Sequence, residues 1–160
     1  FDRHHEALYR FLDRLSRRES SEVDDLVQMT FVEVWRSAAK FRAGATVRTW
    51  IFAIASNLVR HRARSEGRRR AALAELAIAP APAFARAPDA AAIRQQLVDR
   101  LGLALETLPY ELREVFVLCE IEEVPGVEVA RALGLREGTV WRRLHDARKL
   151  LRAALEGGGR

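Results

Sequence analysis

One stretch of this sequence divides the chain into two halves. Residues 71–92 contain twelve alanines and three prolines, and alanine alternates with proline over 79–83. A regular helix cannot continue through this alternation, because proline lacks a backbone N–H and its ring clashes with the preceding turn. The composition instead favours an extended, polyproline-like chain. We therefore expect a linker over 71–92, with at most a turn or two of helix between Ala71 and Ile78.

Both halves place apolar residues at i, i+3, i+4 and i+7, the spacing of one helix face. Before the linker, this spacing predicts helices over 5–18, over about 24–39 and over 50–64. After the linker, it predicts helices over 93–108, 111–121 and 125–133, and a last helix from 137. We therefore predict an all-α fold, with one small helical domain over 1–70 and a second over 93–156. The residues expected in the apolar stripes of the second and third helices include Phe31, Trp35, Ile51, Ile54, Ala55 and Leu58.

The predicted helices after residue 125 have the form of a helix-turn-helix. Pro125 suits a first helical position, Gly134 stands where a helix ends in a left-handed residue, and Leu135 is expected to turn back towards the core. The second helix of such a motif can enter the major groove of duplex DNA. The spacing is also compatible with a plain helical hairpin that has an exposed basic face.

The net charge of +5 is unevenly distributed along the chain. Residues 41–70 contain eight arginines against one glutamate, and residues 136–160 contain seven basic residues against three acidic ones. Between them, residues 111–135 contain six glutamates against two arginines. Two separate basic stretches are the pattern expected of a protein that contacts nucleic acid at two places. The preference for arginine over lysine carries little weight, because a GC-rich genome produces the same bias.

The first basic stretch places polar and aromatic side chains beside an apolar stripe. Trp50, Asn57, Arg60, His61 and Arg64 lie on neighbouring faces of the predicted helix over 50–64. An aromatic ring, an amide and several cations suit a surface that holds unstacked bases and phosphates. The alternative interpretation is a solvated basic helix on an ordinary helical bundle.

Several classes of protein are not expected from the sequence. No apolar run is long enough for a membrane-spanning helix, and no signal peptide is expected at the start. The single cysteine, Cys119, excludes an internal disulfide and a thiolate zinc site, fits a reducing cytoplasm, and is expected to be a buried helical thiol. The four histidines lack metal-ligand spacing, and no nucleophile, carboxylate pair or phosphate-binding loop is present. We therefore predict no enzymatic activity, no cofactor and no metal site.

Four blocks of the sequence closely resemble bacterial RNA polymerase sigma factors of the extracytoplasmic-function group. The blocks are DDLVQMTFVEVWR, FRAGATVRTWIFAIASNL, LPYELREVFVL and VARALGLREGTVWRRLHDARKLLR, in the family's order. The resemblance implies that 1–70 is similar to sigma region 2 and that 93–156 is similar to sigma region 4. It further implies that core RNA polymerase and promoter DNA are partners, that the linker passes through the RNA exit path, and that an anti-sigma factor holds the protein inactive in the cytoplasm.

The resemblance also implies roles for individual residues. Docking on the largest polymerase subunit would use Asp25, Leu26, Gln28, Phe31 and Trp35. Opening of the promoter's −10 element and capture of its non-template strand would use Arg48, Trp50, Asn57, Arg60, His61 and Arg64, with a base pocket near Gly44. Reading of the duplex −35 element would use Arg136, Thr139, Arg142, Arg143, His145 and Arg148. Whether Arg142 and Arg143 contact bases or phosphates stays open.

The chain departs from the family's pattern at several of these positions. His61 stands where an aspartate is common, and Arg136 stands where a proline is common. Trp141 with Arg142 replaces what is often a Lys-Ser pair, and Pro125 with Gly126 replaces the usual polar helix cap. Base preferences at −10 and −35 are therefore not transferred from the family.

A conventional helix-turn-helix regulator, which binds duplex DNA without polymerase, is the alternative function. Such a protein would carry a helical dimerisation or effector domain in place of 1–70. The first basic stretch and the tryptophans of that half argue against it, because an effector domain has no need of a surface that binds single strands.

Overall fold

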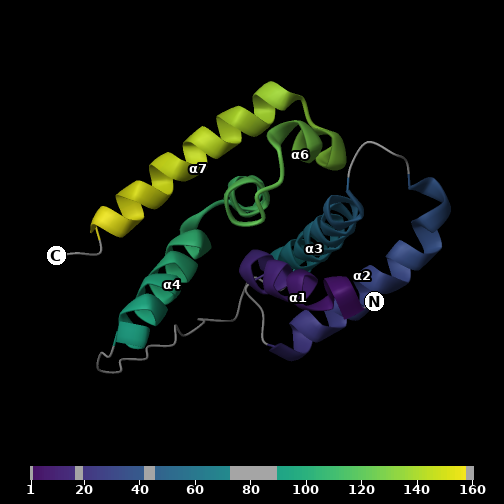
Figure 1. Ribbon diagram of the computed structural model, residues 1–160, viewed down its shortest axis with the longest axis horizontal. Helices are drawn as coiled ribbons and strands as arrows, with labels where there is room; N and C mark the ends of the chain where they lie inside the picture. Colours follow the sequence, from purple (N-terminus) through teal and green to yellow (C-terminus); the bar gives the residue numbers. More distant parts are fainter. Residues whose placement is uncertain (1, 17–19, 42–45, 73–89, 158–160) are drawn as a thin grey trace.

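The structure, a computed structural model, describes residues 2–16, 20–41, 46–72 and 90–157, and within these ranges every regular element is helical. The all-α fold is therefore confirmed for the described part of the chain (Figure 1). None of the helices described is long and apolar enough to span a membrane. The elements are α1 (Asp2–Ser16), α2 (Ser20–Ser37), the 3₁₀ turn η1 (Ala38–Lys40), α3 (Val47–Ala72), α4 (Ala90–Thr107), α5 (Tyr110–Phe116), the π-helical turn η2 (Val117–Ile121), α6 (Gly126–Leu133) and α7 (Glu137–Gly157).

The helices on either side of the expected linker are longer than the sequence pattern predicts. Helix α3 continues past Arg64 to Ala72, and α4 begins at Ala90 rather than at Ile93. Both additions include alanine, the residue with the highest helix propensity. The ends of the predicted 71–92 linker are therefore helical, and its remainder, 73–89, lies outside the described residues.

The first three helices bury one apolar face each around a common centre. Phe11 of α1 stacks on Phe52 of α3 with their ring centroids 4.4 Å apart. On α3, the predicted stripe is only partly correct: Ile51 and Ala55 are buried, whereas Ile54 and Leu58 are half-buried. The helix is covered on two sides, by α1 and α2 and also by α6 of the other half, so Phe52, Ser56 and Val59, which lie off the predicted stripe, are buried as well.

The helix-turn-helix is present as the sequence predicts. Gly134 ends α6 with φ of 65°, and the N–H of Leu135 donates to the carbonyl of Ala130 at 2.8 Å. Pro125 is the residue before the helix and not its first residue; its carbonyl accepts hydrogen bonds from the N–H groups of Glu128 and Val129. The turn therefore fixes α7 across the end of α6.

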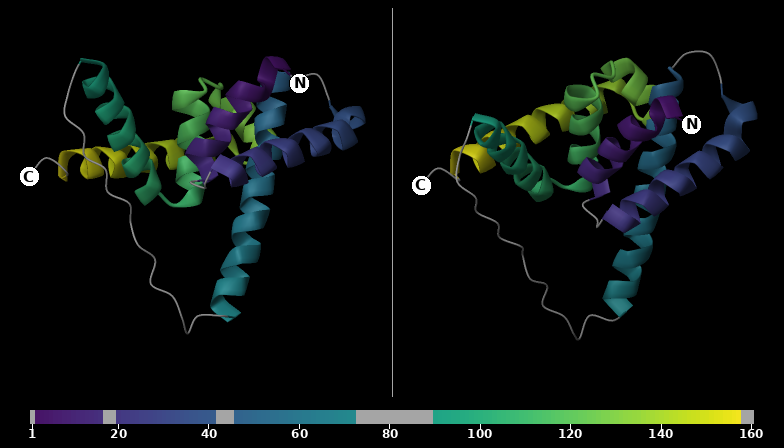
Figure 2. Two further views of the ribbon diagram at one scale, coloured as in Figure 1. Left: turned by 90° about the horizontal axis from the view of Figure 1, so that it is seen from below. Right: turned by 60° about the horizontal axis from the view of Figure 1, so that its bottom comes forward.

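The two halves of the chain pack against each other. One hydrophobic cluster extends from Leu8 and Phe52 in the first half to Val115, Val129 and Val140 in the second. A smaller cluster joins α4 to α7. In Figures 1 and 2, α5 and α6 lie between α1–α3 and the pair α4 and α7, while the C-terminal part of α3 projects away from the body.

Candidate nucleic-acid and polymerase interfaces

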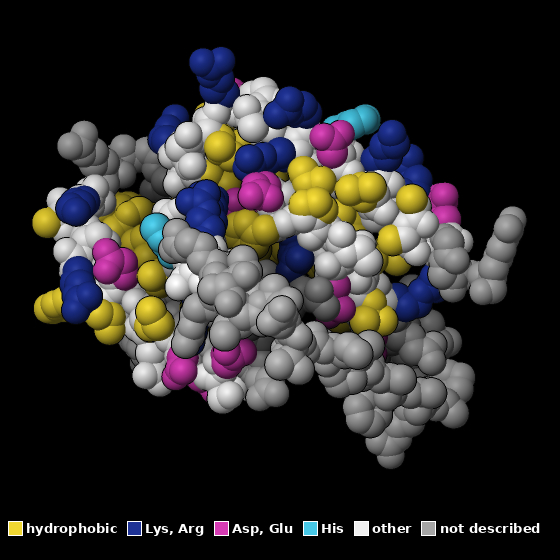
Figure 3. Space-filling view, turned by 180° about the vertical axis from the view of Figure 1, so that it is seen from behind, with side chains coloured by type: hydrophobic (Ala, Val, Ile, Leu, Met, Phe, Trp, Pro, Cys, Tyr) yellow, Lys and Arg dark blue, Asp and Glu magenta, His cyan; other side chains and the backbone are white. Residues whose placement is uncertain are grey.

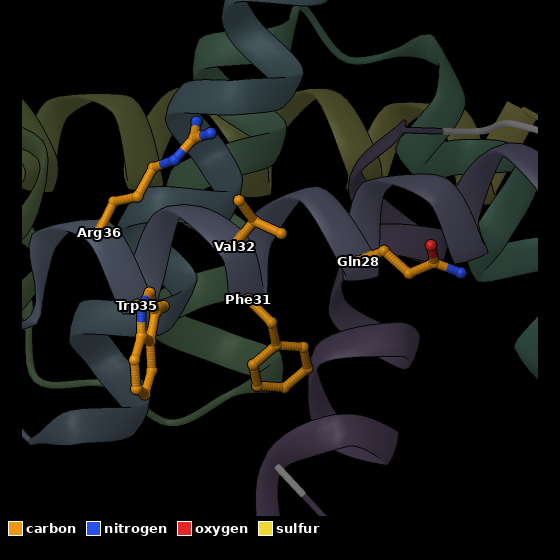
Figure 4. A pocket seen from close by; sticks show the side chains of 5 residues that line it. All are labelled: Gln28, Phe31, Val32, Trp35 and Arg36. Carbon is orange, nitrogen blue, oxygen red and sulfur yellow. The ribbon is translucent and has the colours of Figure 1, made fainter.

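Helix α2 carries an exposed apolar surface. Phe31 and Trp35 project to the same side of the helix, one turn apart (Figure 4), and they line a shallow hollow of about 400 Å³. Trp35 is 84% exposed, so the prediction that it belongs to the buried stripe is wrong. Met29 and Val32 of the same helix are about half exposed. A patch of large apolar side chains open to solvent is typical of a protein-binding surface.

The residues that the resemblance assigns to polymerase binding fall into two groups. Asp25 and Gln28 are exposed on α2, and Gln28 lines the hollow together with Phe31 and Trp35. Leu26, in contrast, is fully buried in the core between the first three helices. Leu26 therefore supports the helix from inside and does not reach its outer surface.

Three of the residues assigned to the −10 element face solvent on α3. Asn57, His61 and Arg64 are exposed at spacings of three and four residues, which places them on one side of the helix. Trp50 is half-buried and packs against the ring of Phe41 at 5.1 Å between centroids. The expected base pocket near Gly44 lies outside the described residues.

Arg60 does not face solvent with them. Its Nη2 donates to both carboxylate oxygens of Glu114 at 2.6 and 2.7 Å, and Glu114 on α5 is fully buried. Beside this pair, the hydroxyl of Tyr110 donates to the backbone carbonyl of Ser56 at 2.8 Å. Burial raises the pKa of Glu114 even though Arg60 acts to lower it, and burial likewise raises the pKa of Tyr110. The charge on Glu114 is thus held in an unfavourable environment that Arg60 only partly relieves.

Arg48 makes a similar contact near the start of α3. Its Nη2 forms an ion pair with the carboxylate of Glu122, and its Nη1 donates to the Glu122 carbonyl at 3.3 Å. Arg14 of α1 also reaches this carboxylate, at 3.2 Å, and the Glu122 side chain is only 5% exposed. Next to it, the hydroxyl of Thr49 donates to Glu128 of α6 at 3.1 Å. Two arginines assigned to the −10 element, Arg48 and Arg60, therefore bind glutamates of the second half of the chain.

The residues assigned to the −35 element lie along α7. Arg136 directly precedes α7, and its backbone carbonyl accepts hydrogen bonds from the N–H groups of Thr139 and Val140. Arg136, Arg142 and His145 are exposed, whereas Thr139 and Arg143 are half-buried. Arg148 is exposed but ion-paired with Glu120 of η2. In the space-filling view, Lys and Arg side chains gather towards the top of the face shown (Figure 3).

Trp141 and Gly126 are structurally coupled, although the sequence alone shows them as separate departures from the family's pattern. A Cβ atom on Gly126 would lie 2.8 Å from Cζ2 of the Trp141 indole. The indole therefore lies against the start of α6 in space that only glycine leaves open. Its Nε1 donates to Glu137 at 3.3 Å, which fixes the orientation of the ring.

Sequence reasoning missed Glu114, Glu122 and Tyr110 as parts of this surface. A signal was present: the acidic stretch over 111–135 follows a strongly basic stretch over 41–70. Opposite charge on two segments favours contact between them but does not identify the pairs. Among the described residues, no group of three or more His, Cys, Asp or Glu side chains could hold a metal ion.

Two family models match the chain in the order of its two halves. The model of Sigma-70 region 2 matches residues 1–69, and the model of Sigma-70, region 4 matches residues 99–151. The second match contains the helix-turn-helix, and the first contains α1, α2 and most of α3.

Curated relatives match over nearly the whole chain. The ECF RNA polymerase sigma factor SigE of Mycolicibacterium smegmatis is 34% identical over 149 residues, which are 93% of this chain and 57% of SigE. The ECF RNA polymerase sigma factor SigM of Mycobacterium tuberculosis is 33% identical over 151 residues, 94% of this chain and 72% of SigM. The RNA polymerase sigma factor CarQ of Myxococcus xanthus is 32% identical over 157 residues, 97% of this chain and 86% of CarQ. The chain thus spans little more than half the length of SigE.

Solved structures share the arrangement of both halves. The sigma factor RpoE of Bartonella quintana, in complex with the anti-sigma factor NepR, matches with a TM-score of 0.74 at 26% identity, over 95% of this chain and 91% of RpoE. CnrH, in complex with the cytosolic domain of CnrY, matches with a TM-score of 0.68 at 28% identity, over 98% of this chain and 84% of CnrH.

Proposed function

Because this chain belongs to the extracytoplasmic-function (ECF) family of RNA polymerase sigma factors, we propose that it binds core RNA polymerase, directs it to specific promoters and helps to melt their −10 element. The observation that carries this proposal is the pairing of two different basic helices in one chain. Helix α7 stands in a helix-turn-helix suited to duplex DNA, and α3 carries an amide, a histidine and arginines beside a tryptophan. Promoter opening needs both kinds of surface.

Polymerase binding is assigned to the outer face of α2. Trp35 supplies an exposed ring and half-buried Phe31 supplies a second apolar side chain to the same hollow, while Asp25 and Gln28 supply polar groups on the same helix. An exposed tryptophan is well suited to such an interface, because it buries a large area with few rotatable bonds. Leu26 is left out of this surface because it is buried.

Binding of the −10 element is assigned to α3. Asn57 offers hydrogen bonds to a base edge, His61 and Arg64 lie on the same exposed side, and Trp50 offers a ring for stacking. Arg48 and Arg60 belong to this surface as phosphate ligands once they leave Glu122 and Glu114.

Recognition of the −35 element is assigned to the outward face of α7. Arg142 and His145 are exposed along that face, and Arg136 lies at its start. Arg143 is half-buried and Arg148 is held by Glu120, so these two are assigned to phosphates. Trp141 presents a fixed aromatic edge next to Arg142.

The remaining assignments follow from the same proposal. Residues 1–70 form the domain for polymerase and −10 binding, 93–156 form the −35 domain, and 71–92 connect them. The chain acts in the cytoplasm, where bacterial polymerase works, and RNA synthesis stays with polymerase because sigma factors are initiation factors and not catalysts. Since RpoE was solved with an anti-sigma factor, we also assign an anti-sigma partner to this chain.

Run-off transcription tests the proposal. Core RNA polymerase is mixed with the purified chain and with DNA fragments recovered by footprinting of the complex on genomic DNA. Transcripts that start at one position and require the chain are expected. If the chain binds the same duplex tightly without core polymerase and never supports initiation, it is a conventional helix-turn-helix regulator instead. The two family matches do not favour that alternative.

A further inference from the structure

We propose that Glu114 and Glu122 act as internal substitutes for DNA phosphates. When the two halves pack together, these carboxylates occupy the anion-binding sites of Arg60 and Arg48, so domain closure and binding of the −10 strand exclude each other. This inference rests on the proposed function, because it takes Arg48 and Arg60 as DNA ligands. It adds that two glutamates of the same chain compete with DNA phosphates for these arginines.

The contact at Glu122 has the form of an anion site. Arg48 and Arg14 both reach its carboxylate, from α3 and from α1, and Arg48 also binds its backbone carbonyl. The planar guanidinium group donates N–H groups to pairs of oxygens on carboxylates and on phosphates alike, so a strand phosphate can take the place of Glu122 at Arg48. The guanidinium of Arg48 also lies over the ring of Phe52 at 5.0 Å, which holds it in place.

The contact at Glu114 links the competition to burial. Its carboxylate has no access to solvent in the packed form, and its only cationic hydrogen-bond donor in the described structure is Arg60. If Arg60 turned to DNA while the halves stayed packed, Glu114 would be left buried without its guanidinium partner, with the long contact to the Tyr110 hydroxyl at 3.4 Å and the charge of Arg143. Breaking a buried pair in this way is strongly unfavourable. Arg60 is therefore free to bind DNA only when α5 separates from α3.

Further hydrogen bonds between the halves make the packing specific. Tyr110 binds the carbonyl of Ser56, Thr49 binds Glu128, and the buried guanidinium of Arg113 donates to the carbonyl of Leu15 at 3.2 Å. Each joins an element of the first half to one of the second. The halves therefore meet in one register, and both glutamates reach their arginines together.

A charge reversal at Glu122 tests the competition. The full chain with Glu122→Lys is titrated against a fluorescein-labelled oligothymidylate of about twelve nucleotides, a length typical of single-strand grooves. Glu123→Lys is the matched control, because Glu123 is adjacent and exposed and the change in net charge is identical. If about nine-tenths of the wild-type molecules are closed, opening raises the apparent affinity about tenfold. Glu122→Lys should therefore bind about tenfold tighter than Glu123→Lys, and equal affinity for the two variants would overturn the proposal.

Closure itself is followed by energy transfer between two dyes. The dyes are attached through Arg10→Cys on α1 and Ala153→Cys on α7, both exposed, in a Cys119→Ser background. Transfer should fall when the oligothymidylate is added to the otherwise wild-type chain, and should start low in Glu122→Lys. Transfer that stays high in both cases would contradict exclusion between closure and strand binding.

A charge swap separates opening from misfolding. Arg48→Glu combined with Glu122→Arg restores opposite charges across the contact, and Arg14→Gln is added because Arg14 would otherwise face a second positive charge; energy transfer should then return to the wild-type value. If transfer stays low after the swap, Glu122 does not act through Arg48 and the proposal fails. Run-off transcription distinguishes the two hypotheses. If the chain supports transcription initiation but the glutamates do not compete with DNA, only this inference is refuted. If the chain opens when it binds the oligonucleotide but never supports initiation, only the proposed function is refuted.

Discussion

Arg60 and Glu114 are 54 residues apart in the sequence, yet one nitrogen of the arginine lies 2.6 and 2.7 Å from the two carboxylate oxygens of the glutamate. This pair joins the helix assigned to the −10 element to the domain assigned to the −35 element. A buried ion pair of this kind adds little net stability. Any arrangement that removes the arginine but keeps the glutamate buried is strongly disfavoured, because it leaves a buried charge without its partner. It therefore fixes the way in which the two halves dock.

The coupling of Gly126 to Trp141 predicts a strongly context-dependent mutation. Gly126→Ala places a methyl group 2.8 Å from the indole, so we expect a loss of about 1 to 3 kcal/mol in the free energy of unfolding. In a Trp141→Ala background, the same change should cost little. Urea unfolding measures both values. Gly102→Ala is the control, because nothing lies within 4 Å of its Cβ position; equal losses at Gly126 with and without Trp141 would contradict the coupling.

The two sides of α2 should respond differently to truncation. Trp35→Ala removes an exposed ring, so affinity for core polymerase should fall by about tenfold or more while the free energy of unfolding stays within about 0.5 kcal/mol. Leu26→Ala empties a core position and should lower the free energy of unfolding by about 2 to 5 kcal/mol. Polymerase binding by fluorescence anisotropy and urea unfolding separate these effects. Unchanged affinity of Trp35→Ala for polymerase would remove α2 from the interface.

Arg142 tests how α7 reads DNA. Arg142→Ala should weaken binding to the cognate −35 element by about 1 to 3 kcal/mol and relax selectivity at one base pair, if this arginine contacts a base edge. Affinity measured across all substitutions at each −35 position gives the answer. A loss that is uniform across sequences would instead assign Arg142 to a phosphate. Lys149→Ala, also exposed on α7, serves as the comparison.

The thiol of Cys119 should react slowly. Burial, and to a lesser degree the neighbouring Glu120, raises its pKa to about 11, so the thiolate is scarce at pH 8. Allowing for the greater nucleophilicity of a more basic thiolate, we expect reaction with a disulfide reagent at least about tenfold slower than for the urea-unfolded chain. The rate should rise with pH until near the raised pKa. A rate equal to that of the unfolded chain would show that the thiol is not protected.

The sequence was sufficient for features that depend on local spacing. The helix-turn-helix was predicted because Gly134 and the apolar stripe of α7 lie within one short segment. The ends of α3 and α4 were predicted less well, because alanine-rich segments next to prolines leave the last turn undetermined. Helix type is therefore readable from periodicity more securely than helix length.

Features that depend on contact between the halves could not be predicted. Phe52, Ser56 and Val59 are buried although they lie off the predicted stripe, because α3 is packed on two sides, and periodicity along one helix cannot show a second covering surface. For the same reason, Arg48 and Arg60 were assigned to the −10 surface without their glutamate partners. Trp35 fits the apolar spacing of α2 yet lies beyond the reach of α1 and α3, so spacing alone could not separate a core position from an exposed one.

Reactivity of −10 thymines with permanganate tests the central claim most directly, because permanganate oxidises thymines that are unstacked and unpaired. Core polymerase with this chain should make −10 thymines reactive on duplex promoters. Asn57→Ala should reduce that reactivity on duplex DNA, yet leave binding nearly unchanged on a template already melted at −10, since Asn57 is exposed on the face proposed to bind the −10 strand. Unreactive thymines with the chain and polymerase bound, or equal losses for Asn57→Ala on both templates, would contradict a role for α3 in promoter melting.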